Sequence, residues 1–512
     1  MSKIMRTRLK NIGFLTAMAL GIGTAQADER ADMEVLRQTT LNLIQALVQQ
    51  GVLTQEKSDQ LIKQAEVKAQ ETVAAQKKAE AGVVRVQYVP ESVRKQITDQ
   101  VREEVVAQAK MERWGDENAV PEWVDRVKLE GDLRLGYQAD RFAQDNAPEI
   151  YQQVSGQNIN NTTKDRDRFG VRARLGINAK ITPEISAGLR LATGNTTNPV
   201  STNQTLGTYG NKYSFVLDRA YLKIHSEDVL PWLTASAGRI PNPWFSTDLV
   251  WNDNLNFEGV ALQIDPNAQG TNAWRPFATV GAFPLQDIEP SSTVNSKSKW
   301  LAGAQVGIEW VPSTLTRAKF GLAYYDYRNI RGQSNTVTNP NGFDGTAAST
   351  RQKGNTLVDI TYPINNPLTD LYGLASDFQL VNLTGMLDLN VSNPVHVMLT
   401  ADYVKNIGSS SIAEPQTTGY MARLAVGMPT MLLKNDWQVS IAYRYLEADA
   451  VLDAFTDSDF HLGGTNNRGF ILGAQYGLGK NTWLSARWMS SNEITGLPLS
   501  IDVFQLYFNA KF

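Results

Sequence analysis

From Val127 to the C terminus, apolar and polar residues alternate along the chain with a period of two. The stretch "RFGVRARLGINAK" at residues 168–180 places its apolar side chains on one face and Arg168, Arg172, Arg174, Asn178 and Lys180 on the other. The stretches "WLAGAQVGIEW" and "WQVSIAYRY" follow the same pattern. A period of two predicts β-strands with one apolar and one polar face.

Three further features separate a membrane barrel from a soluble sandwich, whose strands alternate too. The segments run for about ten to fourteen residues, whereas ordinary strands average five or six. Aromatic residues such as Trp300, Trp310 and Trp437 lie near segment ends, as they do at a lipid–water boundary. Short links such as "VPSTL" and "VSNP" alternate with long stretches rich in Asn, Thr and Gly, which is typical of outer-membrane barrels.

We therefore predict an all-β transmembrane barrel of about 16 antiparallel strands over residues 127–512. Water is absent from the bilayer interior, so the sheet must close and the last strand must pair with the first. The predicted strands lie near 127–138, 168–180, 184–194, 214–225, 232–240, 256–265, 273–283, 299–311, 315–329, 376–390, 395–406, 418–428, 436–447, 467–477, 481–491 and 501–512.

The first 27 residues have the features of an export signal. Lys3, Arg6, Arg8 and Lys10 precede a short apolar run at residues 12–23, and "AQA" stands before Asp28. No later segment approaches the roughly 18 consecutive apolar residues that a spanning helix needs. The chain is therefore expected to be exported, with residues 1–27 as its signal peptide.

Residues 28–118 form a second compositional region. It is rich in Ala, Gln, Glu and Lys, and Met33, Leu36, Leu43 and Leu47 follow a helical spacing. This predicts an α-helical extension. A short coiled coil between copies of the chain and a loosely folded helical spacer both fit the pattern.

Composition narrows the classes of function further. There is no cysteine, and the three histidines are widely separated, so neither a disulfide framework nor a histidine metal site is expected. The net charge is −3, and loss of the cationic signal makes the mature chain more acidic, which argues against nucleic acid as a partner. We expect no cofactor, no bound metal and no enzymatic activity, because the chain lacks GxSxG and any plausible arrangement of catalytic residues.

The C-terminal stretch "FQLYFNAKF" alternates strictly. Phe504, Leu506, Phe508 and Phe512 would meet lipid, while Gln505, Asn509 and Lys511 would face the lumen. A terminal Phe after alternating apolar residues resembles the signal that bacterial barrel-insertion machinery recognises. Ala510 stands where an aromatic residue is more usual.

Several blocks resemble a family of bacterial outer-membrane porins. They are "LIQALVQQGVLTQEKSDQLIKQA", "LDRAYLKI", "GRIPNPW" and "LVWNDNLNFEGVAL". The resemblance implies a passive channel in the outer membrane, with long loops outside and the helical extension in the periplasm. It also implies a homotrimer in contact with outer-membrane lipid and lipopolysaccharide. The extension is a candidate for binding peptidoglycan or another periplasmic partner.

In such porins the third external loop folds into the barrel and narrows it. The corresponding connection here is "PNPWFSTDLVWNDNL", residues 241–255, which carries Asp248 and Asp253. Strand parity directs Arg172, Arg174, Arg190 and Arg219 into the lumen, and Arg239 joins this set with its facing undecided. Arginines opposite loop carboxylates would create a transverse field that disfavours apolar solutes.

Several functions remain open beside a general diffusion porin. A substrate-specific channel could carry anions, organic acids or sugars, with Tyr325 and Tyr327 as candidate aromatic residues of the lumen. An envelope-tethering barrel would use residues 28–118.

The acidic stretch "DAFTDSDF" at Asp453–Phe460 lacks the Gly and the final Glu of a calcium loop, so a solvated external loop is expected there.

Overall fold

The computed structural model describes residues 126–266, 272–363 and 366–512. The predicted signal peptide (1–27) and the predicted helical extension (28–118) lie outside the described residues. The chain divides into two compact units after Val120, and the second unit, Pro121–Phe512, contains all of the described residues.

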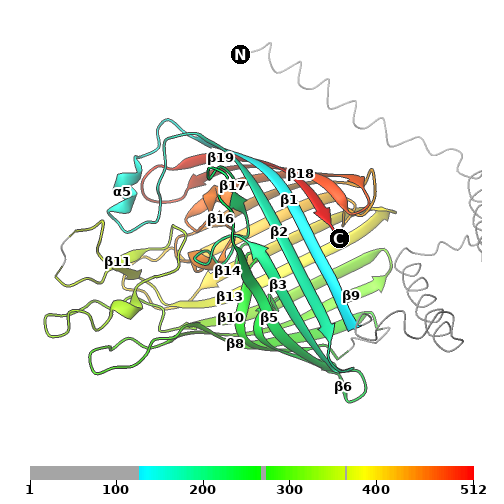
Figure 1. Ribbon diagram of the computed structural model, residues 1–512, viewed down its shortest axis with the longest axis horizontal. Helices are drawn as coiled ribbons and strands as arrows, with labels where there is room; N and C mark the ends of the chain where they lie inside the picture. Colours follow the sequence, from blue (N-terminus) through cyan, green and yellow to red (C-terminus); the bar gives the residue numbers. More distant parts are fainter. Residues whose placement is uncertain (1–125, 267–271, 364–365) are drawn as a thin grey trace, which may run out of the picture. The chain divides into compact units, whose positions relative to one another are not determined.

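In the described part of the chain, seventeen strands form one antiparallel sheet that closes on itself (Figure 1). β4 (Gln204–Thr205) is a two-residue strand that pairs with β2, so sixteen longer strands form the wall. These are β1 (Val127–Phe142), β2 (Arg166–Lys180), β3 (Ile185–Thr193), β5 (Phe215–Ser226), β6 (Leu230–Pro241), β7 (Asn256–Ile264), β8 (Trp274–Gln286), β9 (Lys299–Ser313), β10 (Thr316–Arg328), β13 (Phe378–Ser392), β14 (Val395–Asn406), β15 (Thr418–Gly427), β16 (Trp437–Leu446), β17 (Asn467–Gly479), β18 (Thr482–Glu493) and β19 (Ser500–Lys511). The predicted barrel and its sixteen strands are confirmed, with small differences at strand ends.

The barrel closes between its first and last strands. β1 pairs with β19 in a continuous register from Asp132 opposite Lys511 to Phe142 opposite Ile501. On its other edge β1 pairs with β2. Every long strand thus has two neighbours, which is what backbone groups require in a medium without water.

The two faces of the wall differ as the alternation predicts. On β19, Phe504, Leu506 and Phe508 are each about 40% exposed, whereas Gln505 and Asn509 are buried. The apolar side chains therefore point outward and the polar ones inward, toward the lumen. This is the arrangement of a sheet that faces lipid on the outside and water within.

The connections are sorted by length between the two ends of the barrel. Long connections join β1 to β2, carrying α5 (Glu149–Gln153), and β10 to β13, carrying η1 (Asp344–Thr346), β11 (Leu357–Asp359) and β12 (Tyr372–Leu374). A third long connection, from β16 to β17, carries η2 (Asp453–Phe455) and η3 (Phe460–Leu462). Figure 1 shows α5 and β11 at one end of the barrel and the C terminus at the other. None of the described helices is long and apolar enough to cross a membrane.

Candidate functional site: the barrel lumen

Two cavities lie inside the described barrel. The loop-side cavity, of about 410 Å³, is lined by β1 and β2 together with residues of four long connections, including Asn161, Asn198, Arg351 and Ser458. The turn-side cavity, of about 530 Å³, extends between β13–β19 and the connection from β6 to β7. Arg134 and Tyr507 line both cavities, and the guanidinium carbon of Arg134 lies 4.7 Å from the centre of the Tyr507 ring.

A row of arginines occupies the inward face of β2. Arg172 and Arg174 share one carboxylate: Arg172 Nη2 lies 2.8 Å from Asp132 Oδ1, and Arg174 Nε lies 2.7 Å from Asp132 Oδ2. Arg166 and Arg168 continue the row toward the loop side and line the cavity there. The polar face seen in the sequence therefore lies on the lumen wall, and two of its arginines are joined through the carboxylate of Asp132.

The remaining predicted arginines also have partners. Arg190 Nη2 lies 2.5 Å from Asp218 Oδ2, and Arg219 Nε donates to Asn256 Oδ1 at 2.7 Å. Arg239, whose facing the sequence leaves undecided, donates to the backbone oxygen of Asp218 and forms an ion pair with Glu258. Arg190 and Arg219 extend the network of Arg172 and Arg174 onto β3 and β5. Arg239 lies instead on the outward face, because its cross-strand partner Glu258 shares a face with the exposed Val260 and Leu262.

The connection from β6 to β7, residues 242–255, contacts several distant strands. Phe245 N donates to Gln305 Oε1 on β9 at 2.8 Å, and the hydroxyl of Thr247 donates to Asp402 on β14 at 2.5 Å. At its far end, Asn254 accepts a hydrogen bond from Arg174 on β2 at 3.2 Å. The segment thus bonds inward-facing groups on widely separated parts of the wall.

An aromatic cluster packs beneath this segment. The Trp251 ring lies 4.9 Å from that of Phe257 and 5.1 Å from that of Tyr325, and the Trp244 ring lies 5.2 Å from Tyr325. Tyr325 and Tyr327 are 0% and 3% exposed. The expectation that these two tyrosines line the lumen is wrong, because the segment covers them and they serve as its packing surface.

The two loop carboxylates lie beside arginines of the opposite wall. Four charged groups lie close enough to Asp248 to shift its pKa: Asp457, Arg444, Asp253 and Arg487. Burial, followed by the nearby Asp457 carboxylate, raises the pKa of Asp248 above its ordinary value. Burial raises the pKa of Asp253, and the charges of Arg487 and Arg423 oppose this rise. The structure therefore places Asp248 and Asp253 near the arginines of β15, β16 and β18, while the β2 arginines have their own partner in Asp132.

A second long connection is largely buried. In the segment 447–466, between β16 and β17, Asp453, Thr456 and Phe460 are 2%, 0% and 1% exposed. The hydroxyl of Thr456 donates to the backbone oxygen of Leu249 at 2.8 Å, joining this segment to residues 242–255. The expectation of a solvated external loop at Asp453–Phe460 is wrong.

Salt bridges and apolar contacts explain why segment 447–466 lies there. Asp459 accepts from Arg487 at 3.2 Å, and Asp457 lies 3.6 Å from Arg444. Phe460 packs in a buried cluster with Met489, Leu499, Ile501 and Val503. Met489 on β18 and Ile501 and Val503 on β19 are apolar residues on inward faces that are otherwise mostly polar. This break in the alternation is the sequence signal that could have revealed the segment.

The proposed insertion residues lie together on β19 and at its end. Phe504, Leu506 and Phe508 share the outward face, and Phe512 is 70% exposed. The backbone of Phe512 bonds that of Gly131 on β1 in both directions at 2.9 Å. Their role as an insertion signal stays a prediction.

A closed antiparallel barrel with an apolar exterior and a charged lumen is the architecture of an outer-membrane barrel protein. Residues 37–512 match the model of the family described as "Putative porin" (Porin_5). The chain therefore belongs to this porin family, and family and fold together point to the bacterial outer membrane.

Solved outer-membrane proteins resemble the chain in fold. OprB of Pseudomonas putida is 11% identical, with a TM-score of 0.46 over 76% of this chain and 96% of that one. A loop L8 deletion mutant of OmpT from Vibrio cholerae is 12% identical, with a TM-score of 0.41 over 75% and 99%. The outer membrane channel DcaP of Acinetobacter baumannii is 12% identical, with a TM-score of 0.39 over 75% and 97%. No curated protein sequence matches the chain significantly.

Proposed function

We propose that this protein forms a water-filled channel for passive diffusion of small hydrophilic solutes and ions across the outer membrane. The main support is the pair of lumen cavities that share Arg134 and Tyr507. The segment 242–255 borders the turn-side cavity through residues 245–248 and Asp253. In this proposal the segment folds inward and narrows the pore between its carboxylates and the surrounding arginines.

The charge pattern of the narrow zone gives the channel its selectivity in this proposal. Arg172, Arg174 and Arg190 lie in networks with Asp132 and Asp218, and Arg134 lies between the two cavities. Fixed charges of both signs in a confined aqueous path order water and disfavour apolar solutes. Their balance decides whether anions or cations pass more readily.

The orientation and assembly follow the porin family in this proposal. The long connections face outward from the cell, the helical extension 28–118 lies in the periplasm, and three copies assemble in the membrane. The outward residues Phe504, Leu506, Phe508 and Phe512 would serve first in recognition by insertion machinery and then in contact with lipid.

Single-channel recording in planar bilayers tests the proposal. The purified protein should give discrete conducting steps in KCl, and an absence of steps would refute channel function. Replacing Arg172 and Arg174 together by Ser leaves the Asp132 carboxylate without either partner, so the reversal potential should shift toward cation preference. Replacing the outward-facing Arg141 and Arg328 by Ser removes the same charge away from the lumen and should leave the reversal potential unchanged.

A further inference from the structure

We propose that the loop-side cavity is a binding subsite for a small organic anion carrying two or more carboxylates. This inference rests on the channel function proposed above, because the subsite would lie on the path of the solute. Its volume of about 410 Å³ falls in the range of roughly 300–1,000 Å³ that is usual for small-molecule sites.

The charge of the cavity favours an anion. Among the described residues that line it, six side chains are cationic and two are carboxylates. Both carboxylates already have arginine partners: Asp140 lies 3.5 Å from Arg168, and Asp459 lies 3.2 Å from Arg487. Arg172 is paired with Asp132. The cavity therefore keeps a positive surplus after its internal ion pairs are formed.

Four cationic side chains make up this surplus: Lys353, which donates only to backbone oxygens, and three arginines. Within residues 126–266, 272–363 and 366–512, Arg134, Arg166 and Arg351 have no carboxylate at ion-pair distance. Arg134 bonds only neutral groups, donating to Asn509 at 3.0 Å and stacking on Tyr507. Arg351 Nη1 is buried without a hydrogen-bond partner in the described structure. A buried guanidinium donor without a hydrogen-bond partner is costly, and the charge of a carboxylate bound beside Arg351 would stabilise this guanidinium group.

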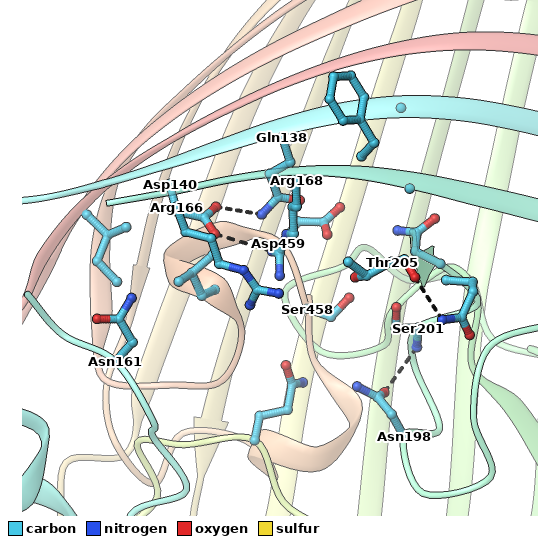
Figure 2. A pocket seen from close by; sticks show the side chains of 18 of the residues that line it. Gln138, Asp140, Asn161, Arg166, Arg168, Asn198, Ser201, Thr205, Ser458 and Asp459 are labelled. Carbon is cyan, nitrogen blue, oxygen red and sulfur yellow. Dashed lines mark hydrogen bonds and ion pairs between the residues drawn. The ribbon is translucent and has the colours of Figure 1, made fainter. Parts of the chain in front are cut away.

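The three arginines come from separate elements around the cavity. Arg134 lies on β1, Arg166 on β2, and Arg351 in the connection between β10 and β13. Figure 2 shows Arg166 and Arg168 extending from β2 toward the segment that carries Ser458 and Asp459. An anion with charge at more than one end could engage more than one of these guanidinium groups, each of which suits bidentate contact with a carboxylate.

Neighbouring residues hold Arg351 in place. Gln352 donates to the backbone oxygens of Asp453 at 2.8 Å and Thr456 at 3.1 Å. Lys353 donates to the backbone oxygens of His461 at 2.6 Å and Gly463 at 2.8 Å. The loop bearing Arg351 is thus fixed to segment 447–466 before any ligand arrives, and preorganisation of this kind lowers the entropic cost of binding.

The test uses succinate as the probe on the full-length mature protein in planar bilayers. Succinate added on the side of the long connections should block the KCl current at millimolar concentration, and its neutral analogue succinamide should not. The Arg166→Gln and Arg351→Gln variants should each weaken the block about fivefold, as expected for the loss of one partly hydrated ion pair. Arg328→Gln removes the same charge from the outward face of β10 and should leave the block unchanged.

The outcomes separate this subsite from channel function. A channel that conducts KCl, is not blocked by succinate, and whose current is the same in Arg166→Gln overturns the subsite and keeps the porin. Equal block by succinamide also overturns it, because charge would then have no role. If Arg351→Gln disturbs the loop, which altered KCl conductance would reveal, the exposed Arg166→Gln variant still decides the matter.

Discussion

The hydroxyl of Thr247 donates a 2.5 Å hydrogen bond to the carboxylate of Asp402, across 155 residues of sequence. Thr247 belongs to the segment 242–255, and Asp402 lies on β14. Asn382 donates to the other carboxylate oxygen of Asp402 at 2.5 Å. Asp402 is 3% exposed. Its buried carboxylate has few other donors within reach, so the bond from Thr247 holds the segment to the barrel wall.

Replacing Thr247 by Val should loosen segment 242–255. Asp402 would stay buried with one donor fewer, at a cost of about 1–3 kcal/mol. If the segment narrows the pore as proposed, single-channel conductance and open-channel noise should both rise. The matched control is Thr482→Val, because Thr482 lies on the outward face of β18. Unchanged conductance in Thr247→Val would argue that this bond does not restrain the segment.

Replacing Trp251 by Ala should detach the same segment from its packing surface. Trp251 is 1% exposed and contacts Phe257 and Tyr325, and truncating a buried Trp costs roughly 3–5 kcal/mol. The sheet does not depend on this ring, so the barrel should still run as a folded species in unheated SDS gels while residues 242–255 become sensitive to protease. Trp437→Ala, on the outward face, should not increase cleavage within 242–255.

A side chain at Gly136 should strain the seam that closes the barrel. A Cβ there would lie 2.4 Å from the ring of Tyr507, its partner across the β1–β19 pairing. Gly136→Val should therefore displace Tyr507 at about 1–3 kcal/mol and lower the temperature at which the barrel unfolds in SDS. Gly170, opposite Gly136 on β2, has its nearest neighbour at 3.4 Å, so Gly170→Val should lower that temperature less. Equal shifts would show that contact with Tyr507 is not the cause.

The attachment of segment 447–466 should depend on pH through Asp453. Burial raises the pKa of Asp453 to about 7, so the packed segment keeps a proton that the detached segment would release near pH 4. The packed state therefore loses stability as pH rises between these values. Each pKa unit is worth about 1.4 kcal/mol, so protease cleavage should be at least about tenfold faster at pH 8 than at pH 5. Asp453→Asn should reduce this dependence, because the protonated Asp453 is its main source, whereas Asp287→Asn, in an exposed connection, should preserve it.

The sequence by itself determined the wall of the barrel. Strand positions follow from strict alternation, because a strand that faces lipid on one side and water on the other cannot shift by one residue without burying charge in lipid. The outward position of Phe504 and the inward position of Arg172 were both readable from this rule. The sorting of connections by length could be predicted as well, because the number of residues between successive predicted strands gives the length of each connection.

The tertiary structure alone decided what fills the lumen. Alternation assigns Tyr325 and Arg174 to the same inward face, yet Tyr325 is covered by Trp251 while Arg174 bonds Asp132 and Asn254. Likewise, nothing local to Asp453 indicates that its segment packs against Ile501 and Val503. Strand faces are set by local periodicity, whereas the path of a long connection depends on contacts between residues hundreds of positions apart, and only the closed barrel brings those residues together.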